Sequence, residues 1–374
     1  MASGADLKAE CKAVRQRFGA PAVGLARVGA SGLEALGCLG ERRHGSGIAV
    51  TEDDLWHIGS CTKSMTATLL ARYVERGELE WDTALAPVFA EYGYQVHPDF
   101  AGLTLRHLLS HRAGMPTDPS PAAADASFGY TTPLEQRAAF TEATLAEAPA
   151  ERPGQAAFCY SNSGYIVAGA LIEAMTGTAW EELMQRELFQ PLGVTTAGFG
   201  APGRTSRGAL ARLFGRDTIA QPWGHLGRRK DSFTALNPDD EQADGPAFTG
   251  PAGTAHLSLP DLARYVAFHV SLGATAPGYL APETIAYLHT PLPGDDYALG
   301  WYAVPPEATG IGKSAIWHEG TNNAWYAVTL IVPDDGQGLA CVCNACPDPI
   351  LDPSAGMVAM ALHEIYTGWL SAAA

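Results

Sequence analysis

The tetrapeptide Ser60-Cys61-Thr62-Lys63 follows a short apolar segment, Leu55–Gly59, and opens a stretch with helical periodicity. Ser60 and Lys63 are three residues apart, so they lie on one face of the predicted helix, one turn from each other. Free backbone N–H groups at a helix N-terminus can bind a developing oxyanion, and the positive end of the helix dipole disfavours a protonated lysine. A neutral lysine is a competent base for a serine hydroxyl. The tetrapeptide predicts a nucleophilic serine, although a solvated first turn of a helix explains the same pattern.

A second group of polar residues, Tyr160-Ser161-Asn162, lies between the turn Pro153-Gly154 and a predicted apolar helix over Ser163–Met175. A tyrosine hydroxyl can relay a proton. An asparagine side chain can donate to a substrate carbonyl while it accepts from a lysine. The alternative interpretation is a helix cap, for which Ser and Asn are favoured residues.

The third group, His318-Glu319-Gly320-Thr321, closes a predicted strand. A glycine at this point lets the backbone approach a ligand closely. The N–H of Thr321 is then a natural second donor to an oxyanion. A turn at a strand end with an exposed histidine is the alternative.

The order and spacing of these three groups resemble the serine β-lactamase and penicillin-binding-protein superfamily. Within it the sequence is most similar to the class C β-lactamase branch, which includes family VIII carboxylesterases and D-aminopeptidase-like proteins. The resemblance extends from about Ala22 to Leu370. Three further stretches support it: Leu103–Pro116, Pro153-Gly154 together with Ser161–Tyr165, and Pro191–Gly193.

The resemblance implies a role for each matching residue. Ser60 would be the acylated nucleophile, and Lys63 and Tyr160 would share the role of base. Asn162 would position both Lys63 and the substrate. The N–H groups of Ser60 and Thr321 would form the oxyanion hole, with His318 and Gly320 beside it in the substrate-binding motif. Which of Lys63 and Tyr160 takes the first proton stays open.

The third group departs from its usual form, because many members of the superfamily carry a lysine where this chain has His318. A lysine is a permanent cation that pairs with a substrate carboxylate. A histidine is mostly uncharged at neutral pH, and Glu319 adds a negative charge next to it in the sequence. A small neutral ester is therefore the expected substrate. Four neighbouring aromatic residues either line an apolar pocket or pack in the core: Trp301, Trp317, Trp325 and Tyr326.

The fold that we predict is α/β (α+β), with an antiparallel sheet flanked by helices and an inserted all-helical lobe, as in β-lactamases and transpeptidases. Residues 1–75 and 250–374 would form the sandwich lobe, residues 76–249 the helical lobe, and the active site would lie in the cleft between them. Loops are expected at 116–133 and 198–245. The expected strands and helices are strands over 21–28, 32–40, 314–317, 324–332 and 339–344, and helices over 6–18, 103–111, 259–272 and 357–370, besides those that follow Ser60 and Ser163.

Composition limits the class of protein further. The chain has 374 residues, 47% of them apolar, and a net charge of −16, which argues against binding to nucleic acid or anionic lipid. No apolar run is long enough for a membrane span. Seven cysteines and no signal-peptide core favour a cytoplasmic protein, although a periplasmic or secreted form whose leader has been removed is the alternative.

We expect neither a metal nor an organic cofactor. His107 and His111 have metal-like spacing without a third ligand, and Cys341, Cys343 and Cys346 fit plain buried thiols. The leading prediction is a serine hydrolase that acts on small-molecule esters, with its oligomeric state open. The alternatives are a β-lactamase or D-amino-acid peptidase or amidase with the same site, and a penicillin-binding protein that is acylated without turnover.

Overall fold

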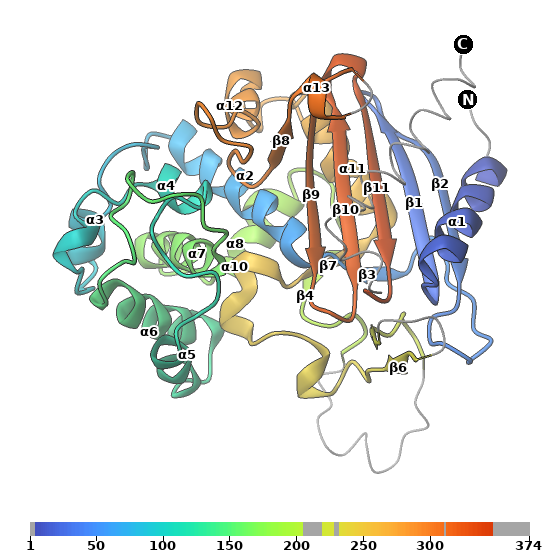
Figure 1. Cartoon of the computed structure of the whole chain (residues 1–374), viewed down its shortest axis with the longest axis horizontal. Helices are drawn as coiled ribbons and strands as arrows, with labels where there is room; N and C mark the ends of the chain where they lie inside the picture. The colour runs from blue at the N-terminus through green and yellow to red at the C-terminus, as the bar shows by residue number, and fades with distance from the viewer. Residues whose placement is uncertain (1–3, 205–218, 228–231, 310–311, 347–374) are drawn as a thin grey trace.

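The computed structural model describes residues 4–204, 219–227, 232–309 and 312–346. Its main feature is a six-stranded sheet in the order β2-β1-β11-β10-β9-β8 (Figure 1). Strand β1 is antiparallel to β11, with Val23 opposite Cys343, so the two ends of the described chain meet inside one sheet. This confirms the predicted antiparallel sheet. The strands are β1 (Ala22–Gly29), β2 (Gly32–Gly40), β8 (Tyr302–Val304), β9 (Ala315–Thr321), β10 (Tyr326–Val332) and β11 (Gln337–Cys343).

Helices cover both faces of this sheet. Helix α1 (Gly4–Phe18) packs on one face, and α11 (Leu259–Val270) packs on the other, as Figure 1 shows. Every residue of β10 is buried, which is expected for a central strand that is covered on both sides. Cys341 and Cys343 of β11 are buried free thiols in the cluster beneath α1, as predicted.

The helical part of the molecule lies on the other side of α2 (Thr62–Glu75) from the sheet in Figure 1. Its most deeply buried element is α7 (Asn162–Thr176), which ends at Gly177 in the left-handed conformation, as its sequence predicted. The other helices here are α3 (Ala86–Glu91), α4 (Leu105–Leu109), α5 (Pro121–Phe128), α6 (Pro133–Ala146) and α8 (Trp180–Leu183). The division into lobes at residues 76 and 249 stays a prediction.

The loop predicted for residues 116–133 is wrong in its middle, where α5 forms. The Ser120 hydroxyl accepts a hydrogen bond from the Ala123 N–H, and Pro121 occupies the first turn, where its missing N–H costs nothing. Helix α6 begins in a similar way, with Thr132 and Glu135 in a reciprocal capping box.

The region 198–245 is mostly loop, as predicted, but short strands interrupt it. Its residues 205–218 and 228–231 lie outside the described residues, as does the helix predicted at 357–370. The remaining elements are β3 (Leu55–His57), β4 (Gly198–Phe199), β5 (His225–Leu226), β6 (Thr234–Ala235), β7 (Ala255–Ser258), α10 (Gly250–Gly253), α12 (Pro282–Leu288), α13 (Pro306–Thr309) and a π-helix over Met184–Phe189.

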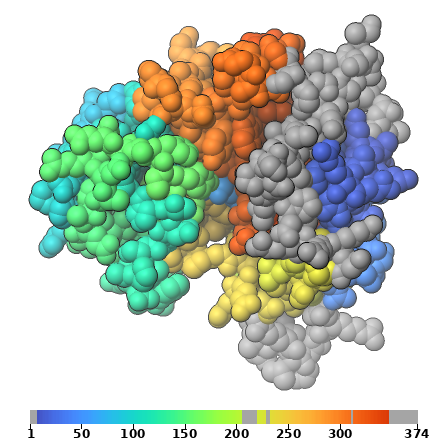
Figure 2. All heavy atoms as spheres, in the orientation of Figure 1, coloured from blue at the N-terminus to red at the C-terminus, as the bar shows by residue number. Residues whose placement is uncertain are grey.

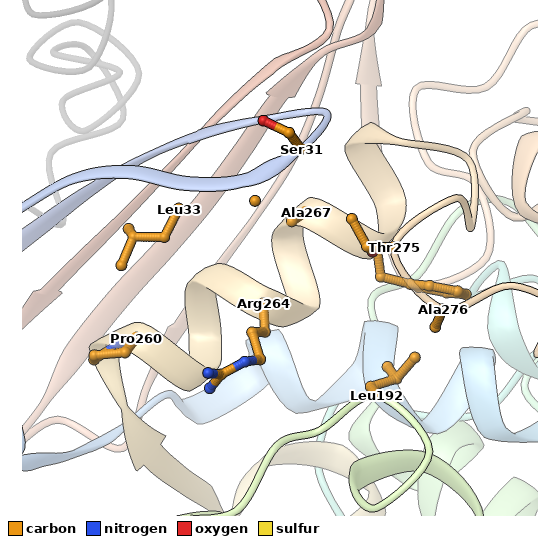
Figure 3. A pocket seen from close by; sticks show the side chains of 10 residues that line it. Ser31, Leu33, Leu192, Pro260, Arg264, Ala267, Thr275 and Ala276 are labelled. Atoms are coloured by element: carbon orange, nitrogen blue, oxygen red, sulfur yellow. The ribbon is translucent and has the colours of Figure 1, made fainter. Parts of the chain in front are cut away.

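A surface hollow of about 340 Å³ lies between the β1–β2 hairpin and α11 (Figure 3). Leu33, Leu192 and Arg264 line it, and none of the predicted catalytic residues does. Within the described part of the chain, the helices are too short or too polar to cross a membrane.

Candidate active site

Lys63 lies at the centre of the predicted site. A 3-10 turn over Gly59–Cys61 presents Ser60, and the first turn of α2 buries Lys63 completely. The Lys63 amine is 3.0 Å from the Ser60 hydroxyl, 2.7 Å from the side-chain oxygen of Asn162 and 2.7 Å from the carbonyl of Ala252 in α10. The structure therefore brings three of the predicted residues together and adds a backbone group that the sequence did not indicate.

Burial lowers the pKa of Lys63 to about 7, against the opposing charges of Cys61 and Asp118. A neutral amine has two N–H bonds and one lone pair. The charged amine donates to Ser60 Oγ as well as to the carbonyl oxygens of Asn162 and Ala252. In the neutral form these two carbonyls can accept both N–H bonds, which leaves the lone pair for the Ser60 O–H. The arrangement can therefore remove a proton from Ser60 at neutral pH.

Tyr160 lies on the other side of this pair. The Lys63 amine is 4.8 Å from the centre of its ring. Burial raises the pKa of Tyr160 well above 10, and a side-chain hydrogen bond with Ser60 only partly opposes this effect. The phenol is thus protonated at neutral pH, which favours Lys63 over Tyr160 as the first acceptor of the Ser60 proton.

Two glycines let β9 touch the turn that carries Ser60. A Cβ on Gly320 would lie 2.0 Å from the Ile58 carbonyl oxygen and 2.4 Å from the Ser60 nitrogen. A Cβ on Gly59, whose φ is +49°, would lie 2.3 Å from the Thr321 nitrogen. The backbone nitrogens of Ser60 and Thr321 therefore flank one tight contact, where two N–H groups can serve a single oxyanion.

Comparison with known proteins agrees with this geometry. A family model described as beta-lactamase matches residues 19–357. The chain belongs to the beta-lactamase family. It is accordingly a hydrolase of the beta-lactamase fold.

The relatives of this chain include a penicillin-binding protein and an esterase. Penicillin-binding protein 4 of Amycolatopsis lactamdurans is 26% identical over 316 residues, which cover 82% of this chain and 76% of the relative. Lovastatin esterase of Penicillium rubens is 27% identical over 221 residues, which cover 55% of this chain and 49% of the relative. The chain thus matches only about half of that esterase.

Solved structures share the fold at lower identity. The D-amino acid amidase from Ochrobactrum anthropi SV3 is 18% identical, with a TM-score of 0.72 over 98% of this chain and 99% of the amidase. A class C beta-lactamase from Rhodobacter sphaeroides is also 18% identical, with a TM-score of 0.70 over 97% of this chain and 98% of that enzyme. Figure 2 shows the teal and green surface of the helical part in contact with the orange surface of the later part of the chain.

His318, at the position where many family members have a lysine, is buried and neutral. Its Nδ1–H donates to the Glu319 carbonyl at 2.6 Å, and its Nε2 accepts from the Tyr297 hydroxyl at 2.9 Å. Burial, with a smaller effect of the Lys63 charge, lowers the pKa of His318 to about 3. Both ring nitrogens are engaged, so this side chain offers no cation to a substrate.

The sequence predicted the negative charge of Glu319 next to His318, and the structure corrects this. Successive residues of a strand face opposite sides, and Glu319 bonds to the Tyr326 hydroxyl on the face covered by α1. The acidic group near the site is Asp118, whose carboxylate accepts from the Asn162 amide at 3.3 Å. Trp301 and Trp325 are buried in the main core, so for these two residues core packing is the correct interpretation and not an apolar pocket.

Several rings to which the sequence analysis gave no role in the site pack against Tyr160. The His111 ring lies 4.3 Å from that of Tyr160 and 4.6 Å from that of Tyr297, and the partly exposed Phe158 packs against both His111 and Tyr297. His111 has a φ of +60°, and its Nδ1 accepts from the Ser161 N–H. His107 instead accepts from the Thr104 N–H, so the two histidines serve separate backbone groups. Among the described residues no three His, Cys, Asp or Glu side chains gather as metal ligands do.

Proposed function

We propose that this protein is a serine hydrolase that cleaves small carboxylic esters through an acyl-enzyme on Ser60. The observation that carries the proposal is the buried Lys63 amine, whose pKa is lowered to about 7 and whose nitrogen lies 3.0 Å from the Ser60 hydroxyl oxygen. A serine hydroxyl becomes a useful nucleophile only beside such a base.

The chemistry proceeds in two halves. Lys63 takes the Ser60 proton while Oγ bonds to the substrate carbonyl carbon, and the N–H groups of Ser60 and Thr321 stabilise the oxyanion. When the tetrahedral intermediate collapses, the C–O bond to the alcohol breaks and the alcohol leaves with a proton from Lys63, relayed through Tyr160. Water then attacks the acyl carbon and gives a proton to the same base. When the second tetrahedral intermediate collapses, the bond between the acyl carbon and Ser60 Oγ breaks, Oγ takes that proton back, and the carboxylic acid is released.

An ester is favoured over an anionic lactam or peptide C-terminus because the third motif lacks its usual cation. His318 is neutral and both of its nitrogens are occupied. The exposed ring of Phe158 and the partly exposed ring of Tyr160 offer apolar contact instead, with the buried Tyr297 ring packed behind them. The names of relatives such as lovastatin esterase are consistent with this choice.

A second candidate is an amidase or peptidase that acts on substrates with a free amine. The exposed Asp118 carboxylate, hydrogen-bonded to Asn162, supports it, because a negative charge at this point favours an ammonium group near the scissile bond. A third candidate, a protein that is acylated but hardly turns over, uses the same residues and differs only in the second half of the reaction.

The test is a panel of short-chain nitrophenyl esters, a chromogenic lactam and D-amino-acid amides, assayed with wild type, Ser60→Ala and the surface control Ser31→Ala. We expect ester hydrolysis with wild type and Ser31→Ala, and a loss of at least about 10³-fold with Ser60→Ala. Intact-mass measurement after a fluorophosphonate should show one adduct that is absent from Ser60→Ala. Full activity of Ser60→Ala would refute the proposal, and faster turnover of amides or lactams than of esters would select the second candidate.

A further inference from the structure

A buried side-chain pair lies directly behind the turn that carries Ser60. The His57 Nδ1 accepts a hydrogen bond from the Gly59 N–H at 3.1 Å, so the ring proton resides on Nε2. That Nε2–H donates to Asp244 at 3.0 Å. The side chains of His57 and Asp244 are 0% and 2% exposed, so solvent does not compete for this bond.

The same carboxylate also reaches the second element of the site. Its other oxygen accepts from the Asn322 side-chain amide at 3.1 Å and from the Gly245 N–H at 2.8 Å. The Asn322 oxygen in turn accepts from the N–H groups of Ala324 and Trp325, at 3.2 and 3.1 Å. These bonds shape the turn that follows Thr321 at the end of β9.

Asp244 therefore connects two segments that are far apart in the sequence. One arm runs through His57 to Gly59, whose neighbour is Ser60, and the other runs through Asn322, whose neighbour is Thr321. Ser60 and Thr321 carry the two N–H groups proposed for the oxyanion. Among the hydrogen bonds of the described residues, the side chains of His57, Asp244 and Asn322 make none to Lys63 or Tyr160.

We propose that Asp244, acting through His57 and Asn322, is a positioning residue that fixes the spacing and direction of the two oxyanion-binding N–H groups. The proposal rests on the proposed function, since it concerns the same site. A displacement of about 1 Å at a catalytic group can cost about 10²-fold in rate, so a buried carboxylate held by three donors is suited to this task.

Asp244→Asn tests the proposal with little change of shape. An amide has one acceptor oxygen, so its NH₂ group must face either the His57 N–H or the donors of Asn322 and Gly245. We expect kcat/KM for a nitrophenyl ester to fall about 10- to 100-fold, mostly in kcat. Glu241→Gln, an exposed residue of the same segment, is the matched control and should keep wild-type rates.

Phenylboronic acid supplies a readout that a merely structural role would not change. Its adduct with a serine places an oxygen where the oxyanion forms, so its affinity should fall by the same factor as kcat/KM. The affinity for the carboxylic acid product should stay within about twofold, because that product binds without the tetrahedral oxyanion. Rates are taken per active site titrated with a fluorophosphonate.

An exchange of the two partners gives a rescue. In Asp244→Asn combined with Asn322→Asp, an amide again faces a carboxylate, and we expect about tenfold recovery over Asp244→Asn. If Asp244→Asn does not fold, Asn322→Ala breaks only the arm to Thr321 and must show the same parallel loss of rate and boronate affinity. Unchanged boronate affinity in either variant, or a double variant no better than the product of the singles, overturns the proposal. A wild type that no fluorophosphonate labels refutes the proposed function instead.

Discussion

At the scale of single residues, the chemistry depends on how Lys63 is surrounded. Its two acceptors at 2.7 Å, Asn162 and the Ala252 carbonyl, are neutral, and the charges of Cys61 and Asp118 only partly offset the burial of a charged amine. Burial is accordingly the main cause of its lowered pKa. A substantial fraction of Lys63 is therefore neutral near pH 7, and that form can take the Ser60 proton.

This environment predicts a pH profile. The kcat/KM for an ester should rise with pH through an apparent pKa near 7, because Lys63 must be neutral to act as a base. Asp118 raises the pKa of Lys63, so Asp118→Asn should move this limb to lower pH. The shift should be less than about one unit and should shrink in high salt, since an exposed carboxylate is screened.

The control for this prediction is Asp125→Asn, an exposed carboxylate in α5. Its profile should overlay that of wild type. A limb that stays in place, or moves to higher pH, in Asp118→Asn would show that Asp118 does not act on the base through its charge.

The sequence predicted the residues of the site that carry short-range patterns and missed those that act across long separations. Ser60 and Lys63 are one turn apart, and Asn162 opens a helix with a recognisable cap. Asp244 and His57 are 187 residues apart, and no local pattern pairs them. Tyr297 reaches His318 from the segment before β8, where it forms an isolated bridge with Tyr302, and this contact depends on the pairing of β8 with β9.

At the scale of elements, the backbones of β9 and of the turn at Gly59–Cys61 approach each other so closely that a side chain does not fit between them. Gly320→Ala would put a Cβ 2.4 Å from the Ser60 nitrogen and 2.0 Å from a carbonyl oxygen, so the strand and the turn must separate. We expect kcat/KM to fall at least about 100-fold, because the N–H groups of Ser60 and Thr321 that we propose as oxyanion donors would move.

Gly102→Ala is the matched control, since its Cβ would meet no atom within 4 Å. Both variants would be assayed per active site and compared by thermal unfolding. Wild-type activity in a folded Gly320→Ala enzyme would mean that β9 does not contribute to the oxyanion site.

Helices and strands were predictable where the apolar pattern of a single segment was enough to identify the element and its ends. Helix α7 and strands β1, β2 and β10 have continuous or periodic apolar residues and clear ends, and the structure has each of them close to the predicted bounds. Helix α5 was missed because its Pro- and Ala-rich sequence has little periodicity, although Ser120-Pro121 is a favourable start. The two-residue strands β5 and β6 exist only through their pairing with each other, which no local pattern encodes.

At the scale of the whole molecule, many interior positions hold neutral histidines. His225, His256, His289 and His318 come from different parts of the fold, and burial is the main cause of the low pKa of each. The pKa falls to about 4 in His225 and His256 and to about 3 in His289 and His318. Their pairing with backbone carbonyls, a tyrosine and a second histidine suits the uncharged ring.

These histidines predict acid sensitivity of the fold. In the unfolded chain each would take a proton near pH 6.5, whereas in the folded protein each stays neutral to about pH 3 or 4. Their contribution to stability is therefore complete above pH 6.5 and is lost as pH falls toward 4, at up to about 1.4 kcal/mol per pH unit for each ring.

Urea unfolding between pH 7.5 and 4.5 should show this decline in the free energy of unfolding. His289→Gln should take up about one proton fewer on unfolding at pH 5, and the exposed surface variant Ser31→Ala should match wild type. Equal stability of wild type at pH 7 and pH 5 would contradict the prediction, because it would require these buried rings to be protonated within the fold.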